Sequence, residues 1–138
     1  MTIDFYSILP LTCAIFVFFF GLFALSEDAR SRMNQVLSGF CFLMLFWLVG
    51  TFMMFATRGD STTAVSWDRF VYAGVVFMPP LMHYFSLLLS GDVSRQKILL
   101  AVNYLFSLLA LLAVPTKLFV DGVYYYSWGV HSQARVLH

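Results

Sequence analysis

The chain has 138 residues, of which 61% are hydrophobic and 11% are charged, and its formal net charge is +1. Soluble domains carry about 25% charged residues, so this chain has too little polar surface to cover a water-soluble globule. A net charge this close to zero also excludes the basic face that nucleic-acid binding requires. The composition therefore predicts an all-α membrane protein, with the lipid bilayer as its solvent and no nucleic-acid partner.

Four uncharged stretches follow one another along the chain. Each comes close to the roughly 20 helical residues that cross about 30 Å of hydrocarbon, although the first and the last are short. Long unbroken runs of this kind exclude β-barrel strands, and the short links between them make consecutive helices antiparallel neighbours. The prediction is a four-helix transmembrane bundle with spans at 8–25, 36–56, 70–90 and 98–114.

Capping residues mark the ends of the last two spans. Ser66 is a candidate N-cap for the third span, and Asp68 would then lie favourably in its first turn. Asp92 or Ser94 could cap the fourth span, and Pro115 should stop it.

The third span contains Pro79 and Pro80 near the middle of the membrane. The two prolines remove the amide donors that would bond to the carbonyls of Val75 and Val76, so a kink is expected. One interpretation is that the prolines simply bend a membrane helix. The other is a hinge or a ligand-cradling role.

His83 is the ionisable side chain within the predicted spans, and such residues usually face the interior of a bundle and often mark function. It shares one helix face with Tyr72, Pro79 and Ser86 by its spacing. Asn103 and Ser107 form a similar stripe on the fourth span, at nearly the same depth. We therefore expect a polar contact between these two spans, and His83 either packs the helices together or acts as a sensor, proton or ligand site. The residues of this expected contact are His83, Ser86, Asn103 and Ser107.

No pattern in the chain indicates catalysis. His83, His131 and His138 have no metal-ligand spacing, and the sequence lacks a serine elbow, a phosphate loop and paired carboxylates in the spans. We therefore expect no catalytic residue, no metal site and no cofactor.

Beyond Pro115 the chain changes character. A β-rich stretch surrounds Asp121-Gly122, and an Asp-Gly pair predicts a hairpin turn. Tyr124, Tyr125, Tyr126 and Trp128 suit a membrane–water interface. The basic residues divide equally among the loops and the tail, so charge alone does not orient the chain.

Several segments resemble the N-terminal seven-helix sensor region of bacterial histidine kinases, which also precedes some diguanylate cyclases. They are WDRFVYAG at 67–74, the proline pair at 79–80, HYF at 83–85 and YSWGVHSQA at 126–134. The resemblance covers nearly the whole chain, as helices one to four plus the loop that leads to helix five.

The resemblance implies a multi-pass protein of the bacterial inner (cytoplasmic) membrane with its N-terminus outside. The aromatic segment 115–138 would then be extracytoplasmic. Three of the seven helices expected for the family are not present, and neither is a phosphoacceptor or ATP-binding motif. We therefore expect either a fragment or a stand-alone relative, which associates with the remaining receptor helices or with other membrane subunits as an oligomer. Residues implied in signal sensing are Tyr72, Pro79, Pro80, His83 and Trp128.

The function expected from these observations is the membrane-embedded sensory or input region of a bacterial signalling receptor, without enzymatic activity in this chain. The alternative is a small structural or assembly subunit of a larger membrane complex. A transporter is less consistent with spans that contain so few polar residues.

Overall fold

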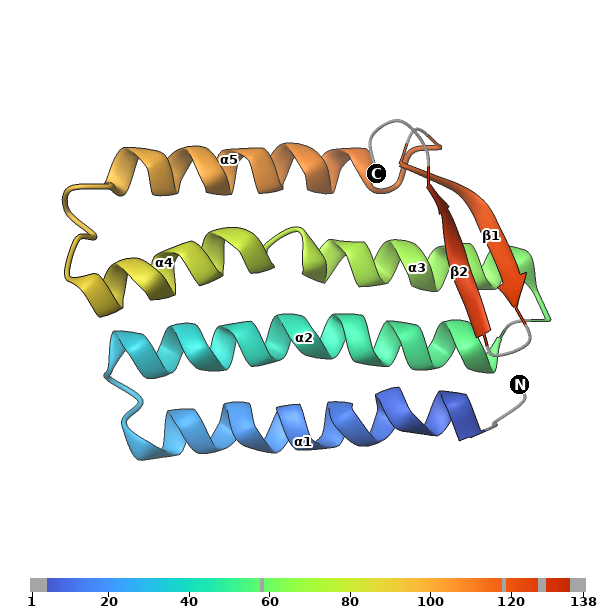
Figure 1. The fold of residues 1–138 in the computed structure, drawn as a ribbon, viewed down its shortest axis with the longest axis horizontal. Helices are drawn as coiled ribbons and strands as arrows, with labels where there is room; N and C mark the ends of the chain where they lie inside the picture. Colours follow the sequence, from blue (N-terminus) through green and yellow to red (C-terminus); the bar gives the residue numbers. More distant parts are fainter. Residues whose placement is uncertain (1–4, 58, 118, 127–128, 135–138) are drawn as a thin grey trace.

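The structure is a computed structural model and describes residues 5–57, 59–117, 119–126 and 129–134. Within these residues the chain forms five helices followed by a two-stranded antiparallel sheet (Figure 1). The elements are α1 (Phe5–Glu27), α2 (Arg32–Ala56), α3 (Ser61–Val75), α4 (Met78–Ser90), α5 (Lys97–Ala113), β1 (Val120–Tyr126) and β2 (Gly129–Ala134).

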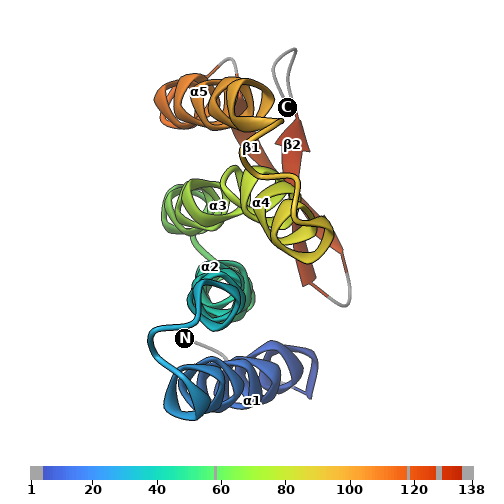
Figure 2. The ribbon, with the colours of Figure 1, turned by 90° about the vertical axis from the view of Figure 1, so that its left-hand side faces the viewer.

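The helices run up and down in chain order, with α3 and α4 forming one interrupted rod (Figure 1). The start of α1, the end of α2, the start of α3 and the end of α5 lie at one end with the two strands; we call this the hairpin end. The links at 28–31 and 91–96 lie at the opposite end, the loop end. Seen end-on, the helices form a row from α1 to α5 (Figure 2): α2 packs against α1 on one side and against α3 and α4 on the other, and α5 packs against α4. The layer is open, so one side of α1 and one side of α5 remain uncovered.

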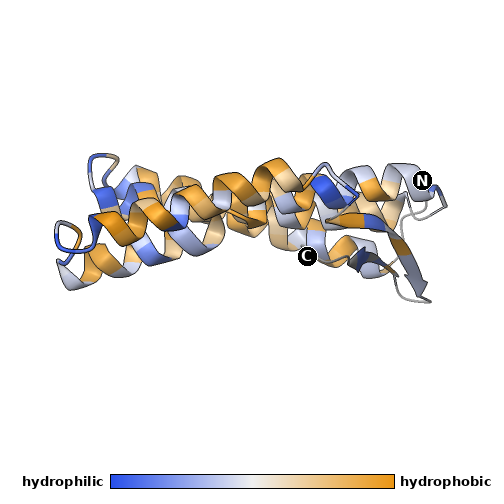
Figure 3. Cartoon of the chain, turned by 90° about the horizontal axis from the view of Figure 1, so that it is seen from above, coloured by the Kyte–Doolittle hydropathy of each residue, from blue (hydrophilic) through white to orange (hydrophobic). Residues whose placement is uncertain are grey.

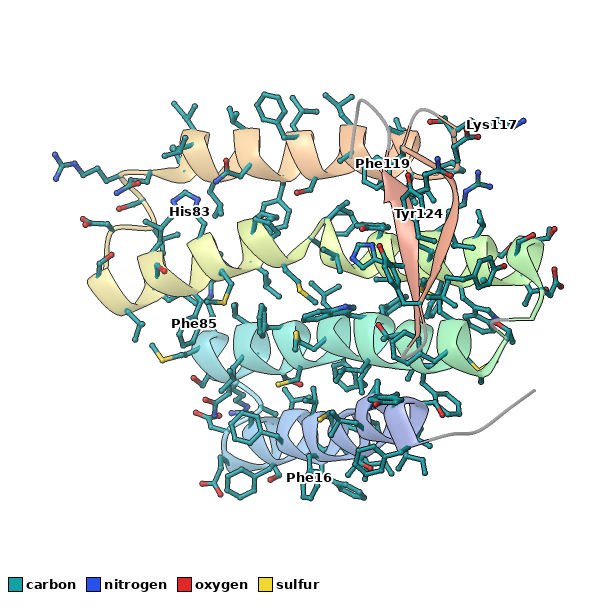
Figure 4. All side chains as sticks on the ribbon, turned by 45° about the vertical axis from the view of Figure 1, so that its right-hand side comes forward. Phe16, His83, Phe85, Lys117, Phe119 and Tyr124 are labelled. Carbon is teal, nitrogen blue, oxygen red and sulfur yellow. The ribbon has the colours of Figure 1, made fainter. Side chains whose placement is uncertain are left out.

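Three helical segments, Phe5–Glu27, Arg32–Ala56 and Ser61–Ser90, are long and apolar enough to cross a membrane, and Lys97–Ala113 is a shorter apolar helix. Apolar residues dominate the middle of the molecule, whereas polar residues gather towards its ends (Figure 3). Phe16 of α1 is 72% exposed and points away from the other helices (Figure 4). Because such a surface is stable in acyl chains and not in water, the prediction of an all-α membrane protein is confirmed.

Small residues bring the first helices close together. A Cβ atom added to Gly21 of α1 would lie 2.9 Å from Cys41 Cβ of α2. One added to Gly74 of α3 would lie 2.5 Å from Phe46 Cβ of α2. Close backbone approach at small residues is the usual packing mode of membrane helices, because lipid supplies little hydrophobic drive for helix association.

Helix α3 begins earlier than the sequence predicts. Its N-cap is Asp60, whose Oδ1 accepts a hydrogen bond from the Thr62 amide at 3.0 Å. The prediction that Ser66 is the N-cap was therefore wrong: its hydroxyl donates to the Thr62 carbonyl at 3.0 Å inside the helix. A carboxylate at Asp60, six residues earlier, offers the free amides a strong acceptor, so the helix extends beyond the uncharged stretch.

The expected interruption at the proline pair is confirmed. Helix α3 ends at Val75, and α4 starts at Met78, with proline in its first positions. The Phe77 amide donates to the Gly74 carbonyl at 3.1 Å, an i to i−3 bond that tightens the last turn. Because prolines supply no amide donors, the α-helical ladder stops and restarts here.

The link to α5 differs in its capping. Gly91 ends α4 in the left-handed conformation, with φ of 75°. The N-cap of α5 is Gln96, which makes no side-chain capping bond, so the prediction that Asp92 or Ser94 caps this helix was wrong. Helix α5 ends at Ala113, just before Pro115, as predicted.

The C-terminal hairpin forms, but its turn is not at Asp121-Gly122. Strands β1 and β2 pair with Tyr126 opposite Gly129, whereas Asp121 and Gly122 lie inside β1. Asp121 is instead the extra residue of a β-bulge, because Val120 and Gly122 pair with consecutive residues of β2. A bulge bends a strand and increases its twist, and here it lies where β1 begins to cross the helix ends (Figure 1).

Two apolar clusters attach the hairpin to the helices. Val120, fully buried, and Phe119 pack with Val114 against Tyr72 and Val76. On the other strand, buried Val130 packs with residues of α2 and α3, namely Met54, Ala64 and Val71. The hairpin is therefore fixed across the ends of α2, α3 and α5.

Candidate functional site

A groove lies between the hairpin, α2 and α3. It consists of two adjoining cavities of about 250 Å³ and 310 Å³, and we call it the hairpin groove. Both cavities are lined by Trp47, Val71, Tyr72 and His131. The first is also lined by Thr51, Met54, Phe55, Asp68 and Val130, and the second by Val75 and Met78.

Three elements supply most of the lining, and α4 adds Met78. Helix α2 contributes Trp47, Thr51 and Met54, which are separated by four and three residues and so share one face. Helix α3 contributes Asp68, Val71, Tyr72 and Val75 at the same helical spacing. Strand β2 closes the groove with Val130 and His131. One face of α2 and one face of α3 therefore line the groove together with β2, although β2 is distant from both helices in the sequence.

Asp68 is the most unusual member of this lining. Its side chain is 3% exposed, and it lies about 10 Å along α3 from the start of the helix, at a rise of 1.5 Å per residue. A buried carboxylate is costly unless polar or cationic groups compensate it. The rim is more open, because Trp47 is 46% exposed and His131 is also exposed. The groove thus has a buried carboxyl group on its floor and an accessible aromatic edge.

Tyr72 connects the groove to two other features. Its ring meets Phe119 edge-on, with centroids 5.0 Å apart and an interplanar angle of 73°. Its carbonyl accepts the hydrogen bond of the Val76 amide at 3.1 Å, directly before the interruption between α3 and α4. Tyr72 therefore lies between the base of the hairpin and the interruption that separates α3 from α4.

A second, more polar cavity of about 460 Å³ lies on the other side of α3, near the start of the hairpin. Arg69 and Lys117 line it together with Asp121. Arg69 Nη2 also donates to the Val120 carbonyl at 3.5 Å, which joins β1 to α3. Arg69 therefore faces away from the hairpin groove, although it is adjacent to Asp68 in the sequence.

On the loop side of the proline pair, α4 and α5 make the polar contact that the sequence predicts. Asn103 Nδ2 lies 2.7 Å from His83 Nδ1, and the pair is partly buried. His83 points from α4 towards α5 (Figure 4). Ser86 is exposed, and its hydroxyl donates to the Met82 carbonyl of its own helix at 3.0 Å. Ser107 is buried on α5.

The residues predicted to sense a signal are thus divided between two places. Tyr72 lines the hairpin groove, whereas His83 lies beyond the interruption and lines neither of its cavities. Pro79 and Pro80 form the start of α4 between them. Trp128 lies outside the described residues. Among the residues that the structure does describe, no three His, Cys, Asp or Glu side chains gather as a metal site would require.

Sequence reasoning missed Trp47, Asp68 and His131 as parts of one site. Asp68 was interpreted as a helix-terminal charge. The available signal was the i, i+3, i+4 pattern of α3, which combines a carboxylate with a tyrosine on one face. The partners of that face on α2 and β2 are visible only in three dimensions.

Comparison with known proteins agrees with this architecture. A family model described as the N-terminal 7TM region of histidine kinase matches residues 9–137. No curated protein and no solved structure gives a significant match. The matched residues include the hairpin and all five helices, except for the first four residues of α1. The chain therefore belongs to the family of N-terminal seven-transmembrane regions of histidine kinases.

Proposed function

We propose that this chain is the membrane-embedded input region of a bacterial signalling receptor, of the histidine kinase or the diguanylate cyclase type, and that it catalyses no reaction itself. Membership of a family of sensor regions supports this proposal. The chain spans the cytoplasmic membrane several times, with the N-terminus and the hairpin end outside and the loop end inside. The signal therefore enters at the hairpin end.

The observation that carries the proposal is the position of Tyr72. It lines the hairpin groove, contacts Phe119 at the base of the hairpin, and bonds through its carbonyl to Val76 at the interruption. A ligand that favours one position of the hairpin shifts the population of two arrangements of α3 and α4. Helix α4 then moves against α5, where the contact between His83 and Asn103 sets the register. Shifts of about 1–2 Å between packed helices are a common form of signal transfer.

The uncovered sides of α1 and α5 indicate what surrounds the chain. Both carry large exposed apolar side chains, such as Phe16 on α1 and Phe106 on α5, which are 72% and 66% exposed. Lipid covers part of this surface. The remaining helices of the receptor, or other membrane subunits, cover the rest, and the receptor works as an oligomer.

A substitution at the helix contact tests the proposal. His83→Leu is introduced into the native gene, and the phosphorylation of response regulators and the cellular level of cyclic di-GMP are measured. Ser86→Ala is the matched control, because Ser86 lies on the same helix and bonds only to the Met82 carbonyl of that helix among the bonds seen here. We expect His83→Leu to change the output while the amount of protein in the membrane stays the same, and Ser86→Ala to leave both unchanged.

The alternative function gives a different result. If His83→Leu leaves every signalling output unchanged but removes co-purifying membrane proteins, the chain is an assembly subunit and the proposal is wrong.

A further inference from the structure

An apolar groove lies between α2 and α4 in the half of the molecule nearest the loop end, and we call it the loop-end groove. Its volume is about 190 Å³, and three residues of each helix line it: Val36, Leu37, Phe40, Leu81, Met82 and Phe85. On each helix the three residues follow the same spacing, which places them side by side on one face. Phe85 lies between α4 and α2 (Figure 4). None of the described side chains that line this groove carries a charge, a hydroxyl or an amide, so its wall is suited to hydrocarbon.

The groove runs along the membrane-spanning part of both helices. Val36 and Phe40 are four and eight residues from Arg32 at the start of α2, which places them about 6 Å and 12 Å along the helix axis. Phe85 and Leu81 lie about 8 Å and 14 Å from the end of α4 by the same rise of 1.5 Å per residue. Because α2 begins and α4 ends at the loop end, the groove extends from about 6 Å to about 14 Å below that end.

The dimensions of the groove favour a slender occupant. A volume of 190 Å³ is below the roughly 300 Å³ at which small-molecule sites begin. A further helix, about 10–12 Å in diameter, cannot enter, because α2 and α4 touch beside the groove: a Cβ atom added to Gly39 would lie 3.5 Å from Leu81 Cδ2. Met82 is 46% exposed, so the groove is open at the surface of the bundle. Apolar walls gain dispersion contacts when a chain lies between them, and an acyl chain of the surrounding lipid is thin and flexible enough to do so.

A cation lies at the end of the groove nearest the link at 28–31. Arg32 is exposed and precedes Val36 by four residues, so the two share one face of α2. No described residue forms an ion pair with Arg32, and Asp28 of the same link instead accepts the Arg30 amide at 2.9 Å. An arginine at the end of a membrane helix extends its charge into the headgroup region, where basic sites between helices attract anionic headgroups. The headgroup that complements this position is therefore negatively charged.

We infer that the loop-end groove holds one acyl chain of an anionic phospholipid, whose phosphate group pairs with Arg32. This site is additional to the proposed function and does not depend on it, because a bound lipid suits a receptor and an assembly subunit alike. His83 and Phe85 are two residues apart on α4 and so point to nearly opposite sides of the helix. The lipid thus supports α4 on the side of α2, while the contact with Asn103 holds it on the side of α5.

Native mass spectrometry of the chain released from detergent micelles tests this inference. Dioleoyl phosphatidylglycerol, which is anionic, is compared with dioleoyl phosphatidylcholine, which is zwitterionic and has the same acyl chains. We expect phosphatidylglycerol to form a saturable one-to-one complex, with a Kd at least about threefold lower than that of phosphatidylcholine. Equal binding of the two lipids, or no saturable binding of phosphatidylglycerol, would overturn the inference.

Two variants test the headgroup and the acyl chain separately. Arg32→Gln should bind phosphatidylglycerol at least about threefold more weakly, whereas Arg95→Gln, which removes an exposed cation from the other loop-end link, should bind it normally. Met82→Trp fills the groove from its exposed edge and should also weaken binding at least about threefold. Its control is Leu105→Trp, which enlarges an exposed side chain of α5 outside the groove. Unchanged binding by Arg32→Gln or by Met82→Trp contradicts the inference.

If either variant loses its helical circular dichroism, the salt dependence of the wild type decides the question without a substitution. The preference for phosphatidylglycerol over phosphatidylcholine should fall as the ionic strength rises, because salt screens the pairing of the phosphate with Arg32. A preference that does not change with salt contradicts the role of the arginine. The same spectra report the oligomeric state. A dimer that Met82→Trp dissociates would show that a second copy covers the groove, and would refute the lipid as its occupant.

Discussion

Asn103 of α5 places its side-chain nitrogen 2.7 Å from His83 Nδ1 of α4, and this hydrogen bond joins two otherwise apolar helices. The side-chain amide of Asn103 and the imidazole of His83 are thus paired across the two helices. The two residues are separated by the link at 91–96 and by roughly two helical turns on either side of it. The contact therefore fixes the depth at which α4 and α5 meet.

The strength of this contact can be measured with a double-mutant cycle of His83→Leu and Asn103→Leu. Polar contacts between membrane helices average about 0.6 kcal/mol, with a maximum of about 1.7 kcal/mol. We expect a coupling free energy in this range, measured by unfolding in mixed micelles. Ser86→Ala should show no coupling to Asn103→Leu, and a coupling as large as that of His83 would contradict the assignment of the partner.

Gly74 is predicted to tolerate no side chain. A Cβ atom there would lie 2.5 Å from Phe46 Cβ and 3.1 Å from the Leu43 carbonyl oxygen, and neither of these atoms is the end of a flexible side chain. Gly74→Ala should therefore force α2 and α3 apart and lower the free energy of unfolding by about 1–3 kcal/mol. Gly59→Ala is the control, because nothing lies within 4 Å of its added Cβ. Equal stability of the two variants would show that α2 and α3 do not pack in this way.

Asp60 should make the stability of α3 depend on pH. The Thr63 hydroxyl, and then the Thr62 and Thr63 amides, donate hydrogen bonds that hold the pKa of this carboxyl below its ordinary value. The charged form is thus favoured in the folded state. Its stabilisation is complete above the unfolded pKa of about 4 and is lost as the pH falls through the lower, folded pKa.

The measurement is the Tm of the wild type and of Asp60→Asn at neutral pH and at about pH 3. Asparagine caps a helix nearly as well but does not titrate. The wild type should therefore exceed the variant in Tm by more at neutral pH than in acid. A difference that grows in acid would reverse the sign and refute the role of the charged cap.

Phe119 should be essential for attachment of the hairpin. It is 7% exposed, and its ring packs edge-on against Tyr72. Phe119→Ala should cost about 3–5 kcal/mol, the usual range for a buried phenylalanine, and expose the hairpin to limited proteolysis. Tyr125 of β1 is 54% exposed, so Tyr125→Ala should leave the cleavage pattern unchanged. Resistance of the Phe119→Ala hairpin to protease would mean that other contacts hold it.

The helices were predictable because their signal is local. An uncharged stretch and a proline pair can each be recognised from adjacent residues alone. The structure contains both the apolar helices and an interruption before Pro79. The start of α3 was not predictable in this way. The uncharged stretch begins after Asp68 and Arg69, whereas α3 includes both residues and has its N-cap at Asp60. The helix accommodates the two charged residues because Asp68 lines the hairpin groove and Arg69 lines the polar cavity beside the hairpin.

The hairpin groove depends on contacts that a single sequence does not reveal. His131 is distant in the chain from Asp68 and Trp47, and pairing of β1 with β2 is needed to bring it there. The Asp121-Gly122 pair has the composition of a turn, yet the apolar packing of Val120 and Phe119 against α3 holds it inside a strand as a bulge. The contact of His83 with Asn103 was predictable, because a short link sets both residues at one depth.

The proposed function depends most on the hairpin end lying outside the cell. Single cysteines at Tyr125, on the exposed face of β1, and at Ala29, in the loop-end link, can be placed in a background of Cys13→Ala and Cys41→Ala and labelled in intact cells with a membrane-impermeant maleimide. We predict that Tyr125→Cys reacts in intact cells, and that Ala29→Cys reacts only after the membrane is opened. Labelling of Ala29→Cys alone in intact cells would contradict the orientation, the entry of the signal at the hairpin groove and the proposed function together.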